Sequence, residues 1–128
     1  MEIKTHLGID RALCGQPLAL EEGRAQVELE LRPEMAVDER GLVHGGFIFG
    51  AADYAAMLAV NDPYVVLGSA QTRFLKPCRV GEKVRFEAQL QEAPGRKKMV
   101  QVQGWRGEVE IFTGSFTCFV LDKHVLEV

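Results

Sequence analysis

Four residues in one stretch of the sequence have groups suited to acyl-transfer chemistry: His44, Gly45, Gly46 and Asp53. The glycines open an apolar run that extends to Val60 and predicts a helix. A Gly-Gly pair at a helix start leaves backbone N–H groups uncovered, and such groups can hold a developing oxyanion. Asp53 is the one acid within this run, and buried carboxylates usually have a partner or a task. The stretch therefore predicts acyl transfer to water, with Asp53 as general base or nucleophile.

The same residues also allow a purely structural interpretation. Asp53 would then cap or pair locally, and the Gly45-Gly46 pair would only permit close packing of a helix against a sheet. His44, a lone histidine beside a helix start, would orient a loop through hydrogen bonds and would not act as a base. The residues by themselves leave both interpretations open.

The spacing of Gly46 and Asp53 limits how they can act together. Seven steps of about 100° return to nearly the same helix face, and a rise of about 1.5 Å per residue separates the two positions by roughly 10 Å. A carbonyl bound at Gly46 would therefore lie too far from Asp53 of the same helix for direct contact. If both residues serve one reaction centre, two copies of the helix run antiparallel, which predicts a two-fold homodimer with shared sites.

The elements around this helix are predicted from alternation and turn residues. Val27, Leu29 and Leu31 alternate with polar residues, which is typical of a strand with one buried face. A short helix is expected at about residues 3–13, with two strands before the apolar helix and four after it. The predicted strands cover residues 18–20, 25–31, 64–76, 84–90, 99–105 and 110–121.

A helix that is apolar nearly all round must be covered on most sides. An antiparallel sheet that curves around the helix would cover most of it, and a second subunit would cover the rest. The predicted fold class is therefore α+β, with the sheet wrapped around one long central helix.

Length, composition and charge limit the function classes. The 128 residues suit one domain, 1–128, and their hydrophobic fraction of 47% is enough for a core. The net charge of -3 does not favour non-specific nucleic-acid binding. The longest apolar run contains Asp53 and is too short for a membrane span, and the N-terminus does not have the pattern of a signal peptide.

The three cysteines, Cys14, Cys78 and Cys118, are odd in number and widely spaced. Neither a CxxC metal motif nor a disulfide framework is present in the sequence. We therefore expect buried or half-buried free thiols, a cytoplasmic location and no metal.

The stretch that begins at Val43 resembles the signature of a known family. Val43-His44-Gly45-Gly46 followed by Asp53 is similar to the signature of the hotdog-fold thioesterases, specifically the PaaI-like (phenylacetate-pathway) branch. Residues 69–77, followed by Gly81-Glu82, resemble the next strand of that family and its turn. The resemblance covers roughly residues 24–121.

The resemblance implies hydrolysis of acyl-CoA thioesters, with coenzyme A as part of the substrate and no separate cofactor. It also implies homodimers with back-to-back sheets, often homotetramers, and two sites in each dimer. Gly46 would be the oxyanion donor, Asp53 of the partner subunit the base or nucleophile, and His44 would shape the site. Gln71 and Thr72 could face the same cleft, although the register of their strand is open.

Coenzyme A carries several phosphates, so basic residues near the site are candidates for binding it. Arg73, Lys76 and Arg79 surround Pro77 and are the better candidates. Gly45 is a further predicted substrate-binding residue. The run at residues 96–98 is more typical of a solvated hairpin tip.

Two alternatives within the fold are weighed against the thioesterase. The sequence also resembles the effector domain of a bacterial fatty-acid-synthesis repressor, which binds malonyl-CoA without hydrolysing it and carries an amide in place of Asp53. Because strand patterning begins by residue 18, we expect no DNA-binding helix-turn-helix, but a non-catalytic acyl-CoA sensor or interaction module stays open. A dehydratase would need a different pattern of histidine and acid, which the sequence lacks.

Overall fold

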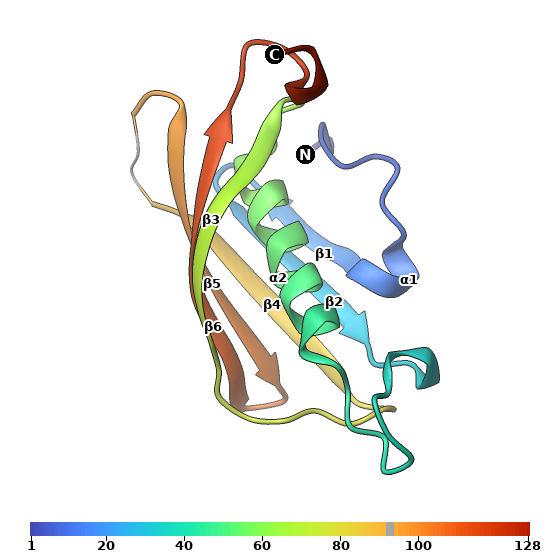
Figure 1. Ribbon diagram of the computed structural model, residues 1–128. Helices are drawn as coiled ribbons and strands as arrows, with labels where there is room; N and C mark the ends of the chain where they lie inside the picture. The colour runs from blue at the N-terminus through green and yellow to red at the C-terminus, as the bar shows by residue number, and fades with distance from the viewer. Residues whose placement is uncertain (92–93) are drawn as a thin grey trace.

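The computed structural model describes residues 1–91 and 94–128, in which six strands form one antiparallel sheet (Figure 1). The spatial order β1-β2-β4-β5-β6-β3 makes β1 and β3 the two edge strands. The strands are β1 (Gln16–Glu21), β2 (Arg24–Glu30), β3 (Val65–Phe74), β4 (Lys83–Leu90), β5 (Lys97–Arg106) and β6 (Val109–Val120). The helices are α1 (Arg11–Cys14) and α2 (Gly45–Val60), with short 3-10 turns at Pro33–Met35 and Val125–Glu127.

Helix α2 is the centre of the fold. It contacts all six strands, and Figure 1 shows the sheet curving around it. Tyr54, Met57 and Leu58 on this helix are each at most 1% exposed, so its apolar surface is covered on most sides. The predicted α+β fold, an antiparallel sheet wrapped around one central helix, is therefore confirmed.

The alternating strands form the wall that packs against α2. In the β2–β4 pair, Val27 lies opposite Phe86 and Leu29 lies opposite Val84, and all four side chains are buried. Burying each such side chain stabilises the fold by about 1.5–3 kcal/mol. The predicted inward face of the strand at residues 25–31 is confirmed.

The predicted helix over residues 3–13 is wrong. Only Arg11–Cys14 is helical, and it begins after Asp10, whose Oδ1 accepts the Ala12 N–H at 2.9 Å. It ends at Gly15, whose φ of 108° lies in the region that favours glycine. Asp10 and Gly15 cap one short helical turn, and the residues upstream of Asp10 form no helix despite their weak helical spacing.

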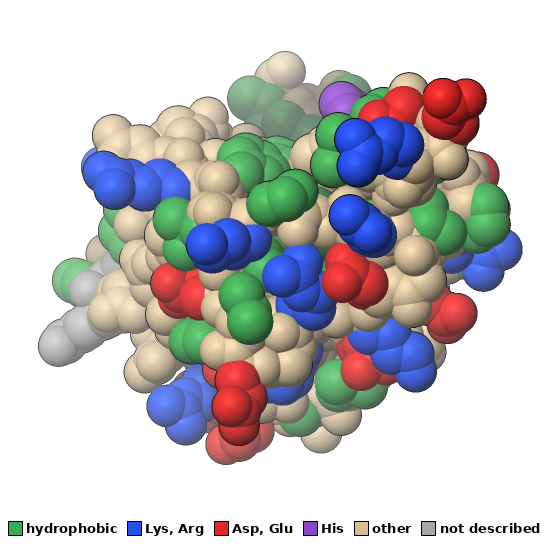
Figure 2. All heavy atoms as spheres, turned by 90° about the horizontal axis from the view of Figure 1, so that it is seen from below, with side chains coloured by type: hydrophobic (Ala, Val, Ile, Leu, Met, Phe, Trp, Pro, Cys, Tyr) green, Lys and Arg blue, Asp and Glu red, His purple; other side chains and the backbone are tan. Residues whose placement is uncertain are grey.

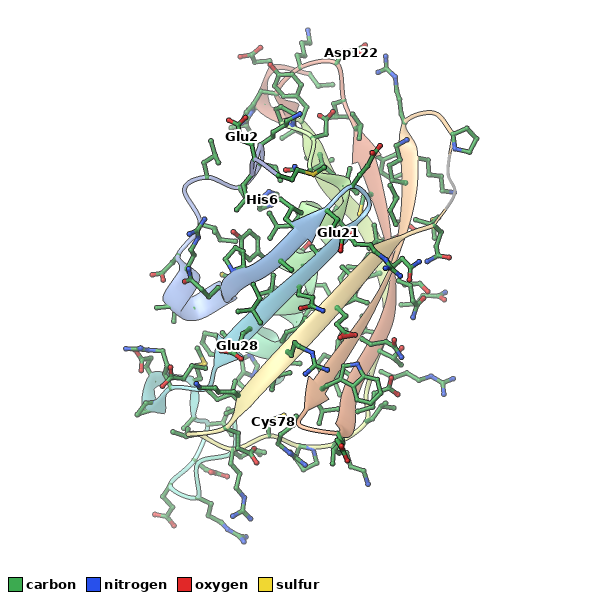
Figure 3. The ribbon with its side chains drawn as sticks, turned by 180° about the vertical axis from the view of Figure 1, so that it is seen from behind. Glu2, His6, Glu21, Glu28, Cys78 and Asp122 are labelled. Atoms are coloured by element: carbon green, nitrogen blue, oxygen red, sulfur yellow. The ribbon has the colours of Figure 1, made fainter. Side chains whose placement is uncertain are left out.

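The first residues of the chain instead lie against the C-terminal end of α2. Asn61, which ends the helix with φ 53° and ψ 47°, accepts the Lys4 N–H and donates its Nδ2 to the Glu2 carbonyl, both at 2.8 Å. Figure 3 shows Glu2 and His6 at this end of the molecule and Cys78 at the opposite end. Hydrogen bonds to a residue far away in sequence thus fix the N-terminal segment in a non-helical path.

Candidate active site at the start of the central helix

Helix α2 begins with unsatisfied backbone donors. The His44 N–H donates to the Met35 carbonyl at 2.9 Å, and the His44 carbonyl accepts the Phe47 N–H at 3.1 Å. The His44 side chain makes no cap hydrogen bond, and the described residues provide no acceptor for the Gly45 or Gly46 N–H. Because the first N–H groups of a helix lack intrahelical acceptors, these two are free to bind an oxygen from outside.

The imidazole of His44 lies over the exposed Gly46. A Cβ at position 46 would lie 2.8 Å from His44 Nε2, so only glycine fits while the ring keeps this position. The ring makes an edge contact with Phe47, with centroids 6.0 Å apart. His44 is therefore held beside the free N–H groups, which fits a role in shaping the site.

Asp53 lies about two turns further along α2. Its side chain is half-buried, and its buried Oδ1 has no hydrogen-bond partner among the described residues. Burial raises the pKa of Asp53 from 3.8 to about 6, because the ionised form loses hydration. An unpaired carboxyl group with such a pKa is suited to accept a proton near neutral pH, and the local-pairing interpretation of Asp53 finds no partner here.

Gly46 and Asp53 share the part of α2 that the sheet leaves uncovered. Gly50 lies between them, and a Cβ built there would meet no atom within 4 Å. The neighbouring positions from Tyr54 to Ala59 are buried, in contrast. The face that carries both candidate groups is therefore open to another molecule.

The pairing of β3 with β6 defines which side chains of β3 face the helix. Thr72 pairs with Gly114, and a Cβ at position 114 would lie 2.9 Å from Thr72 Cγ2 and 3.1 Å from the ring of the buried Phe116. Thr72 therefore lies on the helix side of the sheet. Side chains alternate along a strand, so Gln71 and Arg73 lie on the outer side and are not brought to the helix start within one chain.

A hollow of about 300 Å³ opens beside Gly45 and is lined mainly by apolar side chains. Phe74 and Ile48 form part of its wall, and the Phe74 ring would lie 3.5 Å from a Cβ at position 45. Lys76 and Pro77 form another part. The predicted residues Gly45 and Lys76 thus line one hollow, and Phe74 is a wall residue to which the sequence analysis gave no role.

A second hollow, of about 380 Å³, shares Pro77 with the first. It is lined by Arg79, one of the predicted substrate-binding residues, and by Arg40 and Arg106, to which the sequence analysis gave no role. Arg40 comes from the loop before α2, Arg79 from the segment after β3 and Arg106 from the end of β5. No spacing in the sequence could have connected three residues from such distant segments.

All three cysteines are free, with Cys78 and Cys118 buried and Cys14 half-buried, as predicted. Burial, and secondly the Asp53 carboxylate, raise the pKa of Cys118 to about 12. The pKa of Cys14 is raised by burial, then by Asp10 and Asp53. The raised pKa keeps these two thiols protonated at neutral pH, which makes them poor nucleophiles.

Two further properties concern residues 1–91 and 94–128 alone. Within these ranges no three His, Cys, Asp or Glu side chains are grouped as a metal site requires. None of the helices there has the length and apolar character needed to cross a membrane.

The fold and this site agree with the family comparison. Residues 40–112, more than half of the chain, match the model of the thioesterase superfamily, and the chain belongs to this superfamily. The crystal structure of a mutant of the phenylacetic acid degradation protein PaaI from Thermus thermophilus is 28% identical, with a TM-score of 0.78 over 87% of this chain and 96% of that one. The predicted relationship to hotdog-fold, PaaI-like proteins is confirmed.

A closer structural match comes from Pyrococcus horikoshii. The crystal structure of an uncharacterized protein from this organism is 55% identical, with a TM-score of 0.97 over 98% of this chain and 97% of that one. This similarity extends the fold assignment to the N-terminal segment but names no activity.

Curated relatives are longer proteins. Methylthioribose-1-phosphate isomerase from Aquifex aeolicus is 50% identical over 123 residues, which are 95% of this chain but 27% of that protein. Transcription factor FapR from Caldanaerobacter subterraneus is 26% identical over 127 residues, which are 98% of this chain and 62% of that protein. The chain thus spans between about a quarter and three-fifths of the length of these relatives.

Proposed function

We propose that this protein is an acyl-CoA thioesterase that hydrolyses its substrate to a free acid and coenzyme A. The observation that carries the proposal is Asp53: a half-buried carboxyl group without a hydrogen-bond partner among the described residues, on the same uncovered helix face as the free Gly46 N–H. Membership of the thioesterase superfamily supports the same reaction class.

Each group has a defined task in this proposal. The Gly46 N–H donates to the thioester carbonyl oxygen, whose negative charge grows as the tetrahedral intermediate forms. His44, over Gly46, limits how the thioester can approach that donor. Thr72, on the helix side of β3, is the better placed of the two polar candidates on that strand.

Two copies of the chain are needed to bring the groups together. Gly46 and Asp53 are separated by roughly 10 Å along one helix, which is too far for both to touch one carbonyl carbon. A two-fold axis beside α2 would bring Asp53 of the partner subunit to Gly46. The strand β3 supports this arrangement, because it is an edge strand with an unpaired backbone on one side.

The reaction balances with water as the only second substrate. In the general-base route, Asp53 of the partner subunit takes a proton from water as the water oxygen bonds to the thioester carbon. The C–S bond then breaks, and the thiolate of coenzyme A takes up the proton. In the nucleophilic route the carboxylate attacks first, and the C–S bond breaks as the thiolate of coenzyme A leaves. Water then hydrolyses the resulting anhydride to the free acid and the Asp53 carboxylate, and the thiolate takes up the released proton.

The test is release of free thiol from a panel of short, aryl and long acyl-CoA esters. Wild-type protein should release thiol from at least one class, and Asp53→Asn should lower that rate at least 100-fold while the protein stays folded and dimeric. Asp122→Asn is the matched control, because this exposed carboxylate lies at the far end of the molecule (Figure 3). Unchanged turnover in Asp53→Asn would remove Asp53 from the mechanism.

A non-catalytic acyl-CoA sensor is the second candidate function. Its supporting observation is the similarity to transcription factor FapR over 98% of this chain. A sensor would bind acyl-CoA esters without releasing thiol from any of them. The same panel, run with a binding measurement beside the thiol assay, separates the two functions.

Assembly and location complete the proposal. We expect a homodimer, and a homotetramer if two dimers join through the outer faces of their sheets; sedimentation of the purified protein measures this. We expect no nucleic-acid partner, no membrane association and no cofactor or metal beyond the substrate itself. The free cysteines are typical of a reducing cytoplasm, where acyl-CoA substrates would be found.

A further inference from the structure

The segment of residues 75–82, which connects β3 to β4, lies against the start of α2. It forms no regular strand, and the Val43 N–H donates to its Cys78 carbonyl at 2.9 Å. His44 follows Val43 directly, and the free Gly46 N–H lies two residues further along the chain. The position of this connecting segment therefore determines where the imidazole and the free N–H groups lie.

Arg106 ties the connecting segment to the sheet. This residue ends β5, and its Nη1 donates to the Pro77 carbonyl at 2.7 Å. Pro77 has no N–H of its own that could bond elsewhere. Among the hydrogen bonds described for residues 77–79, only the one from Arg106 comes from a strand of the sheet. Arg106 is therefore the residue that attaches this part of the segment to β5.

Glu82 holds the next peptide group of the connecting segment. Its Oε1 accepts the Arg79 N–H at 2.6 Å, and its Oε2 lies 3.5 Å from Nε of Arg106. The Arg79 N–H and the Cys78 carbonyl belong to one planar peptide group, so a rotation of this group moves both. Glu82 thus holds one side of the peptide group whose other side accepts the Val43 N–H.

The surroundings of Arg106 and Glu82 favour a fixed arrangement of the pair. An isolated exposed ion pair holds a chain weakly, but here each partner also bonds a backbone group, and the two side chains are only 29% and 33% exposed. Figure 2 shows this end of the molecule, with basic and acidic side chains next to one another among hydrophobic ones. Burial raises the pKa of the Cys78 thiol, and the Arg106 guanidinium acts in the opposite direction, as expected for a positive charge beside this residue.

We propose that Arg106 and Glu82 are positioning residues for the reaction at the start of α2. They act through the connecting segment on His44 and on the Gly46 N–H, and neither side chain needs to touch the substrate. This inference rests on the proposed function, in which the Gly46 N–H binds the thioester oxygen. A shift of about 1 Å in a group that binds the reacting atoms can slow a reaction about 100-fold, so loss of the pair lowers kcat.

The kinetic test uses Arg106→Met, which keeps the length of the side chain and removes both of its polar contacts. On the preferred acyl-CoA ester kcat should fall at least about tenfold, with KM within about threefold of wild type. Arg85→Met is the matched control, because Arg85 on the neighbouring strand β4 also loses an ion pair, with Glu87 at 3.2 Å. Its kcat should stay within about twofold of wild type. A change confined to KM would make Arg106 a substrate ligand, and an equal fall in the control would remove its special role; either result overturns the proposal.

Two further variants test whether the residues act together. Arg106→Lys keeps a charged donor for the Pro77 carbonyl but lacks the planar fork that reaches Glu82 as well, so its kcat should lie between those of wild type and Arg106→Met. Adding Glu82→Ala to Arg106→Met should lower kcat by less than about twofold more, because both changes release the same segment. A lysine variant no better than the methionine variant, or losses that multiply, would contradict a shared positioning role.

Amide hydrogen exchange tests the same link without any substrate. In Arg106→Met the Val43 N–H should exchange at least about tenfold faster than in wild type, because its acceptor is no longer held. The Asn61 N–H, which donates to the Met57 carbonyl at the other end of α2, should exchange at an unchanged rate. Faster exchange at both positions would indicate a general loss of stability, and unchanged exchange at Val43 would break the link to the helix start; either result overturns the proposal.

The two measurements distinguish the failure of this inference from the failure of the proposed function. If wild-type protein releases thiol from no acyl-CoA ester, the proposed function fails, and the exchange rate of the Val43 N–H still decides whether Arg106 positions the start of α2. If wild-type protein is active and Arg106→Met matches it in both kcat and Val43 exchange, the positioning role is wrong and the proposed function stands.

Discussion

The two ends of helix α2 differ in the hydrogen bonds that they make to the rest of the chain. At the C-terminal end, which we call the closed end, Asn61 turns the chain, its N–H donates to the Met57 carbonyl at 2.8 Å, and its side chain binds Glu2 and Lys4. At the N-terminal end, the open end, the described residues offer no acceptor to the Gly45 and Gly46 N–H groups. The C-terminal end is thus tied to the rest of the chain by hydrogen bonds, whereas these two N–H groups at the N-terminal end are not.

The difference shows how the fold divides stability from chemistry. Hydrogen bonds at the closed end are made within the chain, so their energy is already used in folding. The N–H groups at the open end are free to donate to a ligand. The half-buried Asp53 has a pKa raised to about 6, so it binds a proton more tightly than an exposed aspartate does. Substitutions at the closed end should therefore change stability, and those at the open end should change turnover.

The largest expected effect is on the pH dependence set by Asp53. Its folded-state pKa of about 6 exceeds the usual 3.8, so the folded protein binds the proton more tightly than the unfolded chain does. The stability that this provides is fully present below about pH 4 and is lost as pH rises through about 6. Relative to Asp53→Asn, wild type should lose up to about 3 kcal/mol of unfolding free energy between pH 4 and 7.

Denaturant titrations of both proteins across this range measure the difference, and parallel pH profiles would contradict it. The same pKa governs activity in the opposite direction. A general base must be ionised, so kcat/KM should fall about fivefold from pH 6 to pH 5. A rate that rises on acidification would exclude a general-base role for Asp53.

Gly46→Ala should lower kcat/KM about 100-fold, because the new Cβ meets His44 Nε2 at 2.8 Å and displaces the ring from the site. Alanine is the better helix former by about 1 kcal/mol, so the unfolding free energy should not fall. Steady-state kinetics and thermal unfolding together test this.

His44→Ala provides the matched background for this substitution. With the imidazole removed, Gly46→Ala should add little further loss of activity. A full 100-fold loss in that background would mean that the Cβ itself obstructs the substrate, and the role assigned to His44 would be wrong.

Asn61→Ala should do the reverse, lowering the unfolding free energy by about 2 kcal/mol and leaving kcat/KM within twofold. Alanine is unfavourable at φ 53°, and the hydrogen bonds to Glu2 and Lys4 are lost. Asn61→Gly removes the same bonds without the backbone cost and should lose less stability. Chemical denaturation compares the unfolding free energies of the three proteins. A tenfold fall in the activity of Asn61→Ala would contradict the assignment of stability to the closed end and turnover to the open end.

Tyr54→Phe should have the smallest effect, because this residue belongs to neither end. The Tyr54 hydroxyl is buried and finds no hydrogen-bond partner among the described residues. Removing it should change the unfolding free energy by less than about 0.5 kcal/mol, with a tendency to stabilise. A loss of more than about 1 kcal/mol, or of tenfold in activity, would reveal a partner that the folded chain acquires on assembly.

The sequence predicted the fold where one physical rule decided the outcome. Val27 and Leu29 alternate with polar residues, and burial of one face of a strand follows directly. The apolar helix and the placement of Gly46 at its start followed equally from composition. The candidate site could be proposed from the sequence because both of its groups lie on this single element.

Features that depend on contacts between distant segments could not be predicted. Helical spacing at residues 3–13 was overridden by hydrogen bonds from Asn61, which lies far along the chain. The choice between Gln71 and Thr72 required the pairing of β3 with β6. Arg40 and Arg106 meet only because the loop before α2 and the end of β5 reach the same end of the molecule.

Both chain termini lie at the closed end (Figure 1). A polypeptide fused to either terminus would therefore leave the molecule away from the helix start and its two hollows. In the isomerase of Aquifex aeolicus the matching sequence is likewise joined to further polypeptide, because it makes up 27% of a longer chain. The fold is thus suited to serve as a module that keeps its working surface exposed when it is built into a larger protein, or when it is tethered to a solid support for assay.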